Sequence, residues 1–331
     1  MEKQNLATTY LGLKLKNPLL VGSCELTGSV KGIRELAAGG AAGVVLKSLF
    51  EEQIEIELAG HLAGYQSDYP GACEYMRNFT RNTAVDDYLT LIAGAKSAVD
   101  IPIIASINCV SASEWIAFAD SVEKAGADAL ELNLSLLPSH RTRTGAEVEQ
   151  IYFDIVKKVS DRVSLPIAVK MSSSSAGLAS LIDRLARSGD CRVSGFVLFN
   201  RHYRPDINID TMEMTMAEPF STPAEITEPL RWIGLLSGSV EADFASSTGV
   251  HDRDGMIKLL LAGAAAVQVV STVYQHGPGR IAEILSGVRE WMAEKSFGTI
   301  ADFQGRLRST ALADPAVYER IQFIRQFAGG R

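Results

Sequence analysis

The chain has 331 residues, of which 47% are hydrophobic and 21% charged, and its formal net charge is −7. This composition is typical of a globular enzyme with a large core. The acidic balance and the lack of any Lys/Arg cluster argue against a nucleic-acid partner.

The cysteines and histidines give no sign of a metal site. The four cysteines, Cys24, Cys73, Cys109 and Cys191, form no Cys-x-x-Cys pair, and the histidines show no ligand spacing. The first residues lack the pattern of a signal peptide, and no segment approaches the roughly 20 apolar residues of a membrane span. We therefore expect a cytoplasmic protein without a metal.

Short apolar runs alternate with amphipathic stretches along most of the chain. The runs that predict strands are 17–23, 41–48, 101–107, 127–138, 165–170, 194–200, 243–249 and 265–272. The stretches that predict helices are 29–38, 86–98, 113–125, 148–162, 178–188, 252–262 and, beyond the last strand, 279–295 and 300–304 onward. Residues 229–238 fit either a helix or a strand, and we favour a helix. About eight β/α units in order predict an α/β protein, a closed (β/α)8 TIM barrel formed by one domain over residues 1–331.

Two connections are too long for ordinary loops of a barrel. Residues 49–85 lack a clean hydrophobic period and contain Pro70, and residues 201–228 are rich in polar residues and contain Pro205, Pro219 and Pro223. Loops of this length are usually functional. We expect both to form lids over the mouth of the barrel.

Polar side chains stand at the ends of several predicted strands, where a barrel carries its active site. Lys47 and Lys170 each end a buried strand, which is costly unless the ammonium meets an anionic or electron-rich partner. The alternative is that these lysines reach solvent. The amides of Asn108, Asn133 and Asn200 suit a planar, hydrogen-bonding heterocycle, although Asn133 would also be explained as a buried amide bonded to neighbouring backbone.

The last two predicted strands end in residues suited to a phosphate group. Thr248-Gly249-Val250 follows one strand, and Ser271 and Thr272 end the other. Backbone N–H groups and hydroxyls at this place in a barrel commonly hold phosphate. We therefore expect a phosphate site here.

Two motifs are specific, Glu131-Leu-Asn-Leu-Ser135 and Thr299-Ile-Ala-Asp-Phe-Gln-Gly-Arg-Leu307, with support from 11–18, 46–48, 169–170, 248–250 and 268–272. In these segments the chain resembles the dihydroorotate dehydrogenase family, in particular its soluble branch. This resemblance implies an FMN-containing barrel that pairs as a homodimer. It also implies that FMN contacts Gly22, Ser23, Lys47, Ser48, Asn108, Asn133, Lys170, Asn200, Thr248, Gly249, Ser271 and Thr272, and that Asn133 and Asn200 face the substrate.

The chain departs from this family mainly in the substrate half of the site. Leu136 stands where the soluble branch has its catalytic Cys, so Ser135, Cys109 or His140 would have to supply the base. Residues 70–85 lack the family's Asn-Ser-Met-Gly-Leu loop, and Phe220-Ser-Thr-Pro-Ala-Glu225 replaces a Gly-rich segment. Arg201 stands where Ser is usual, and we expect it to pair with a substrate carboxylate.

The expected activity is that of an FMN-dependent oxidoreductase acting on a CH–CH bond of dihydroorotate or a related substrate, in pyrimidine biosynthesis. Lys170 would lie where negative charge develops on the reduced flavin. The alternatives are a flavin-binding electron-transfer or regulatory protein without dehydrogenase activity, and a flavin-free lyase or isomerase. The partners expected are a small, anionic, planar substrate and a second subunit, with no membrane.

Overall fold

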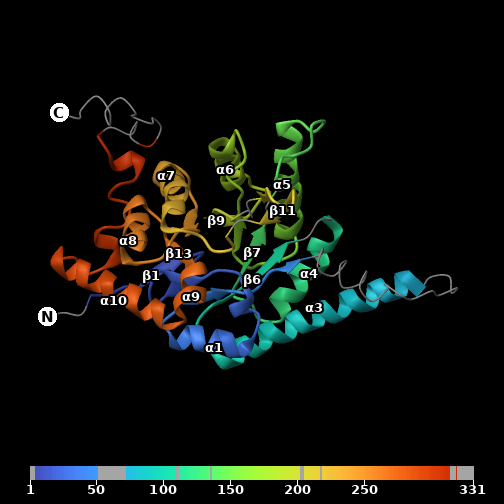
Figure 1. The fold of residues 1–331 in the computed structure, drawn as a ribbon, viewed down its shortest axis with the longest axis horizontal. Helices are drawn as coiled ribbons and strands as arrows, with labels where there is room; N and C mark the ends of the chain where they lie inside the picture. The colour runs from blue at the N-terminus through green and yellow to red at the C-terminus, as the bar shows by residue number, and fades with distance from the viewer. Residues whose placement is uncertain are drawn as a thin grey trace.

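The computed structural model describes residues 4–50, 72–108, 112–134, 136–201, 205–216, 218–313 and 318. Within these residues eight parallel strands close into a barrel (Figure 1). They are β3 (Leu19–Val21), β4 (Gly43–Val45), β6 (Ile103–Asn108), β7 (Ala129–Asn133), β8 (Ile167–Lys170), β9 (Val193–Leu198), β12 (Asp243–Ser247) and β13 (Ala266–Val269). The pairing of β13 with β3 and of β4 with β6 completes the circle, so the predicted TIM barrel is confirmed.

Helices surround the barrel on its outer face. They are α1 (Val30–Ala38), α3 (Ala72–Ala98), α4 (Ala112–Lys124), α5 (Gly145–Ser160), α6 (Leu178–Arg187), α7 (Thr227–Leu236) and α8 (Arg253–Ala262), followed by α9 (Ser271–His276) and α10 (Gly279–Glu294). The helix that we favoured at 229–238 is α7. Single 3-10 turns are η1 (Glu25–Thr27), η2 (Pro223–Ile226), η3 (Ile300–Asp302) and η4 (Ser309–Ala311).

Local sequence explains where α5 begins. The Thr144 hydroxyl accepts a hydrogen bond from the backbone of Glu147, and the Glu147 carboxylate accepts one from the Thr144 N–H at 2.6 Å. These two bonds satisfy two backbone N–H groups that a helix start otherwise leaves without partners. From there Tyr152, Ile155 and Val159 face the core.

A hairpin that the strand pattern did not predict lies at the amino-terminal end of the chain. Strands β1 (Thr8–Tyr10) and β2 (Leu13–Leu15) pair antiparallel, and Tyr10 and Leu11 are buried within a cluster of barrel residues. Small barrel side chains, Ala129, Ala168 and others, belong to the same cluster and leave room for this hairpin. Three-residue strands carry too short an alternation to be identified from sequence.

The first long connection differs from the predicted lid. Residues 51–71 lie outside the described part, but Ala72–Ala98 is one helix of 27 residues, so α3 begins well before the predicted start at 86. No Gly or Pro interrupts residues 72–93, and their helix propensity rather than an amphipathic period accounts for the longer helix. The two-residue strand β5 (Leu49–Phe50) pairs with β6.

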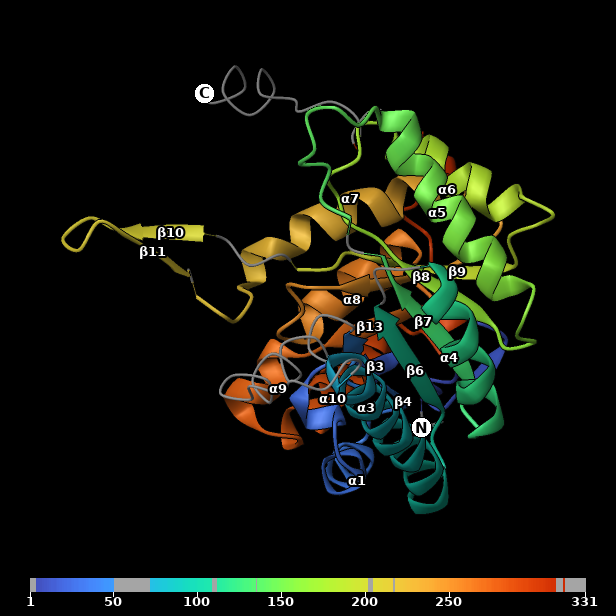
Figure 2. The same cartoon turned by 90° about the vertical axis from the view of Figure 1, so that its right-hand side faces the viewer.

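The second long connection contains a hairpin. Strands β10 (Pro205–Asn208) and β11 (Glu213–Met216) pair antiparallel and extend away from the barrel (Figure 2). Residues 218–226 instead pack onto the barrel mouth, where Ser221 bonds to Ser271. The described part of this connection is therefore only partly the lid that we expected. No helix in the described residues has the length and apolar character needed to cross a membrane.

Candidate functional site

Glu131, Lys170 and Gln268 form a buried polar triad inside the barrel. Because strand side chains alternate, Glu131 and Asn133 share the inner face of β7, and Lys170 is the paired neighbour of Asn133 on β8. The Lys170 Nζ lies 3.3 Å from Glu131 Oε1 and 3.5 Å from Gln268 Oε1, while Gln268 Nε2 donates to Glu131 Oε2 at 2.7 Å. All three side chains are buried, Glu131 at 1% exposure.

This triad is incompletely satisfied. Glu131 Oε1 accepts no hydrogen bond from the described residues, so its 3.3 Å contact with Lys170 is an ion pair of loose geometry. Both Nζ distances exceed the 2.7–2.9 Å typical of charge-assisted hydrogen bonds. The ammonium has three donors. Lys170 can therefore donate to a further acceptor at the barrel mouth.

Two of the predicted amides lie together. Asn200 Nδ2 donates to Asn133 Oδ1 at 3.0 Å, and the Asn200 N–H donates to the carbonyl of Met171 at 2.9 Å. These contacts fix the amide of Asn200 beside the end of β7. Asn108 ends β6 and is half-buried.

The ends of β3, β4 and β6 are joined by serine hydroxyls. Ser48 Oγ lies 2.9 Å from Ser23 Oγ and 2.7 Å from Ser106 Oγ, and the Ser48 N–H donates to Ser23. Gly22 precedes this chain of hydroxyls, and a Cβ there would come within 3.1 Å of Gln268 Oε1. The backbone after β3 thus passes close to the buried triad.

The two lysines differ in their surroundings. Lys170 is buried, whereas Lys47 is one-third exposed and its Nζ forms an ion pair with Glu25 at 2.5 Å. Lys47 would have to leave Glu25 to contact a ligand in the barrel mouth. Lys170 is therefore the stronger indication of an electron-rich ligand.

The backbone after β12 is held in an unusual conformation. Thr248 and Gly249 have φ values of +80° and +81°, and the Thr248 hydroxyl donates to the carbonyl of Phe199. A Cβ on Gly249 would come within 2.3 Å of the backbone N of Ile226. Strained residues of this kind gather at ligand sites.

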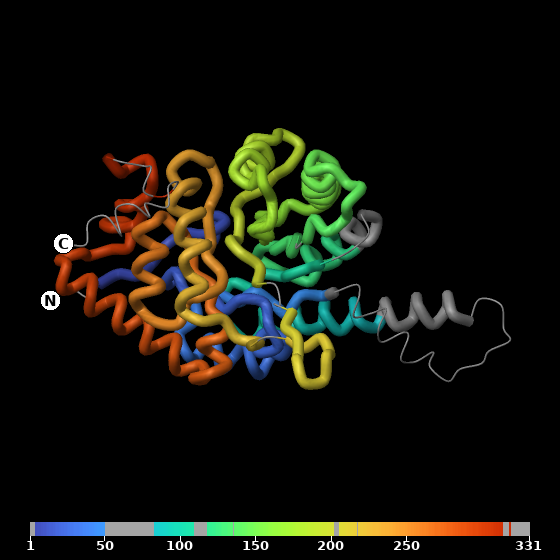
Figure 3. Tube along the Cα trace, turned by 45° about the horizontal axis from the view of Figure 1, so that its top comes forward, coloured from blue at the N-terminus to red at the C-terminus, as the bar shows by residue number. Residues whose placement is uncertain are grey.

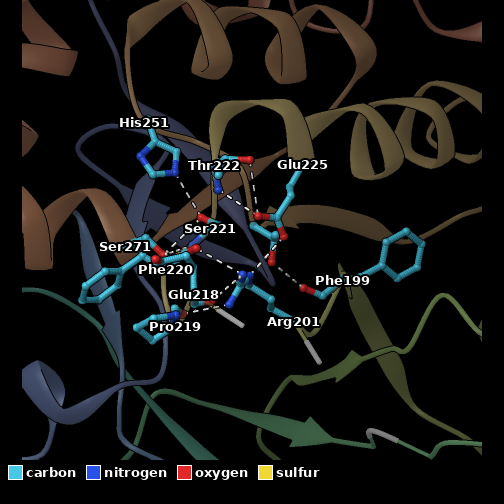
Figure 4. A network of polar contacts seen from close by, with 11 residues as sticks. Phe199, Arg201, Glu218, Pro219, Phe220, Ser221, Thr222, Glu225, His251 and Ser271 are labelled. Carbon is cyan, nitrogen blue, oxygen red and sulfur yellow. Dashed lines mark hydrogen bonds and ion pairs between the residues drawn. The ribbon is translucent and has the colours of Figure 1, made fainter. Parts of the chain in front are cut away.

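A polar network connects this turn region to the second long connection (Figure 4). The Ser221 N–H donates to Ser271 Oγ at 2.9 Å, and Ser221 Oγ lies 3.1 Å from His251 Nε2. Thr272 donates to the carbonyl of His251 at 3.1 Å. Burial lowers the pKa of His251 below its usual value, which favours the neutral ring. Ser221 therefore links the His251 ring to the Ser271 hydroxyl.

Arg201 lies in the same network, and its guanidinium makes four contacts there. Its Nε is 3.0 Å from Glu225 Oε2, and its terminal nitrogens donate to the carbonyls of Glu218, Pro219 and Phe220. Glu225 is fixed in turn, because its other oxygen accepts from the Thr222 N–H at 2.8 Å. A carboxylate that accepts two hydrogen bonds from the guanidinium would have to displace one of these partners, so the structure gives Arg201 the surroundings of a clamp on residues 218–225.

Of the three candidate bases, the described residues include His140 alone. Cys109 and Ser135 lie outside the described residues, and His140 is exposed. Leu136, which occupies the expected position of a catalytic Cys, is half-buried and packs against the core.

Sequence reasoning missed four residues of this site as functional candidates: Glu131, Gln268, Ser221 and Glu225. A signal existed for the first two, since a Glu and a Gln inside apolar strands must find buried partners. No local signal marked Ser221 or Glu225, because their partners come from distant segments.

The tight packing at Gly249 leads to a stability prediction. Gly249→Ala should lower the free energy of unfolding by about 2–4 kcal/mol, since it adds both φ strain and a backbone clash. Gly12→Ala is the matched control, because Gly12 also has a positive φ, +76°, but nothing lies within 4 Å of its Cβ position. Gly12→Ala should lower the free energy of unfolding by only about 1 kcal/mol. Urea denaturation of both variants checks this, and equal costs would contradict a role for the contact with Ile226.

Comparison with known proteins places the chain among similar sequences over nearly its whole length. A family model described as dihydroorotate dehydrogenase matches residues 5–292. The catalytic subunit of dihydroorotate dehydrogenase B (NAD(+)) from Thermoplasma volcanium is 27% identical over 312 residues, which is 91% of this chain and 98% of that protein. The corresponding subunit from Methanosarcina mazei is 27% identical over 316 residues, covering 92% and 96%. A putative dihydroorotate dehydrogenase A (fumarate) from Aeropyrum pernix is 25% identical over 307 residues, covering 91% and 96%.

Proposed function

Because the chain belongs to the dihydroorotate dehydrogenase family, we propose that it is an FMN-dependent oxidoreductase acting on a CH–CH bond of dihydroorotate or a related small, anionic, planar substrate. The family supports the oxidoreductase class. The observation that carries the cofactor proposal is Lys170, a buried ammonium whose two contacts leave donor capacity at the barrel mouth.

The residues present fit FMN at both ends of the molecule. Lys170 would donate to the flavin ring, and the hydroxyls of Ser23 and Ser48 would lie along it. Thr248, Gly249, Ser271 and Thr272 would hold the phosphate, joined by Ser221, whose hydroxyl lies 3.1 Å from that of Ser271. When bound, the flavin supplies the two-electron acceptor that amino-acid side chains lack.

This chain's residues would orient the substrate and remove its proton. The joined amides of Asn133 and Asn200 would donate to the polar edge of a planar heterocycle. The base is proposed among Ser135, Cys109 and His140, because the aliphatic Leu136 cannot accept a proton. Burial of the barrel interior would keep water from the reacting bond.

One observation favours a second candidate function. Leu136 removes the usual base, while the proposed cofactor half of the site keeps its polar groups. A flavin-binding electron-transfer or regulatory protein without dehydrogenase activity needs only that half. We propose that the protein acts in the cytoplasm as a homodimer with either of these two functions.

An absorbance spectrum followed by anaerobic addition of dihydroorotate tests the proposal. We expect flavin bands in the purified protein or after addition of FMN, and we expect dihydroorotate to bleach them. Bands that persist with dihydroorotate but bleach with dithionite would favour the electron-transfer protein or another substrate. A protein that stays colourless and binds no added FMN would contradict both.

A further inference from the structure

Ser271 carries a hydroxyl proton that no described residue accepts. Its Oγ accepts two hydrogen bonds, one from the Ser221 N–H at 2.9 Å and one from the Ser221 hydroxyl at 3.1 Å. A serine oxygen has two acceptor positions and one donor, so the Ser271 O–H is the group that remains to bind a ligand. Ser271 is half-buried and begins α9, just beyond the end of β13, where the proposed phosphate site lies.

The direction of these bonds identifies the nitrogen of His251 that carries hydrogen. The Ser221 hydroxyl has a single proton, which it donates to Ser271. In the 3.1 Å contact between Ser221 Oγ and His251 Nε2, the ring nitrogen is therefore the donor. Nδ1 is then the basic nitrogen of the neutral ring. Figure 4 shows the imidazole directed at Ser221, which in turn contacts Ser271.

A relay of hydrogen bonds therefore runs from the His251 ring through Ser221 to Ser271. Its members come from three segments, since Ser221 precedes η2, His251 precedes α8 and Ser271 begins α9. Figure 3 shows this part of the chain, coloured from yellow to orange, on one side of the molecule. A proton gained at Nδ1 would leave the relay intact and would give its first donor a positive charge. Hydrogen bonds from charged donors are roughly twice as strong as those from neutral donors.

We propose that His251 is the cationic partner of the flavin phosphate, and that its ring takes up a proton when the phosphate binds to Ser271. This inference rests on the FMN-dependent function proposed above. One proton passes from the solvent to Nδ1, and no covalent bond to the phosphate forms or breaks. The hydroxyls and backbone N–H groups proposed for the phosphate are neutral, whereas a phosphate monoester carries about −1.5 to −2 charges at pH 7. A charged imidazole offsets part of that excess.

The groups around His251 keep its ring neutral before a phosphate binds. Burial is the largest cause of its lowered pKa. Three smaller influences act in both directions: the Asp252 carboxylate and the Ser221 backbone raise the pKa, and His276 on α9 lowers it. The Glu225 carboxylate on η2 also raises it.

A bound phosphate would change this balance. Arg280 on α10 donates from Nε and Nη2 to the carbonyl of His251, so it adds a positive charge on the backbone side of that residue. A phosphate at Ser271 would place a larger negative charge at the end of the relay. A nearby opposite charge favours the charged form of a group, so binding should raise the pKa of His251.

The sign of the pH dependence follows from this change. When binding raises the pKa of a group, the ligand binds most tightly below the pKa of the free protein, and its affinity falls as the pH rises through the pKa of the complex. The FMN phosphate loses its own second proton at about pH 6, so measurements above about pH 6.5 isolate the histidine. We expect the dissociation constant of FMN to rise about 3–10-fold between about pH 6.5 and 8.5.

Titration of the full-length chain, freed of flavin, with FMN and with riboflavin tests the proposal. Riboflavin has the same ring system and lacks the phosphate, so its dissociation constant should stay constant over this pH range. Flavin fluorescence measures both affinities. Calorimetry in buffers of different ionisation enthalpy counts the protons bound, and we expect uptake with FMN and none with riboflavin. This readout needs no variant.

Two histidine variants assign the proton to a residue. His251→Gln keeps a side-chain N–H that can donate to Ser221 but cannot become charged, so it should bind FMN more weakly near pH 6.5 and without the pH dependence. His276→Gln is the matched control, because it removes an exposed histidine from α9 that lies outside the relay. It should keep the wild-type pH dependence.

The possible outcomes separate this inference from the proposed function. A wild type that binds FMN without proton uptake, or a His251→Gln variant with the wild-type pH dependence, would overturn the role of His251 and leave the FMN-dependent function standing. Equal proton uptake with riboflavin would place the protonated group away from the phosphate and would also overturn that role. A chain that binds no FMN at any pH would overturn both.

Discussion

Replacing Lys170 with methionine is expected to abolish most of the dehydrogenase activity and to destabilise the barrel. The substitution removes the cation expected beside the flavin, where reduction develops negative charge, and we expect the rate of flavin reduction to fall about 10²–10³-fold. It also leaves the Glu131 carboxylate buried with Gln268 as its remaining hydrogen-bond donor among the described residues. Removing one partner of a buried ion pair typically costs about 3–5 kcal/mol. Stopped-flow reduction and urea denaturation measure the two effects.

A double variant separates these two roles of Lys170. Glu131→Gln combined with Lys170→Met removes both charges and keeps an amide that can bond to Gln268. Its stability should return to within about 2 kcal/mol of wild type, because no charge remains buried. Its flavin reduction should stay as slow as that of Lys170→Met. Recovery of the reduction rate would show that the ammonium serves only to neutralise Glu131.

Replacing Arg201 with alanine is expected to loosen residues 218–225 and to weaken binding of the flavin phosphate. The side chain makes four contacts, one to the Glu225 carboxylate and three to backbone carbonyls, and it is largely buried. We expect a loss of about 2–3 kcal/mol in stability and a rise of about 10–100-fold in the dissociation constant of FMN, measured by flavin fluorescence. The reason is that Ser221, within this segment, bonds to Ser271 at the proposed phosphate site.

Two controls distinguish this clamp from a substrate-binding arginine. Arg201→Lys keeps the charge but lacks the planar fork that reaches several acceptors, so it should be intermediate in FMN affinity. Glu225→Gln removes the carboxylate charge that Arg201 Nε contacts, and it should also be intermediate in FMN affinity. If Arg201→Ala instead leaves FMN affinity unchanged and raises only the KM for an acidic substrate, Arg201 binds the substrate carboxylate.

The barrel could be predicted from the sequence alone. Buried parallel strands are continuous apolar runs, and polar residues that end them must lie at the mouth, so Asn133, Lys170 and Asn200 were located without coordinates. The start of α5 could also be predicted, because the two residues that cap it, Thr144 and Glu147, are three positions apart. The short β1–β2 hairpin and the long α3 were not predicted, since neither has a clear hydrophobic period over the residues in question.

Which polar groups meet depends on how distant segments pack in the folded chain. Lys170 and Gln268 are 98 residues apart in sequence, and the ion pair of Lys170 with Glu131 depends on the register between β7 and β8. The charge of Arg201 is visible in the sequence, which is why a substrate carboxylate was expected as its partner. The acceptors that it contacts include backbone carbonyls, which every residue has, so no sequence pattern marks them.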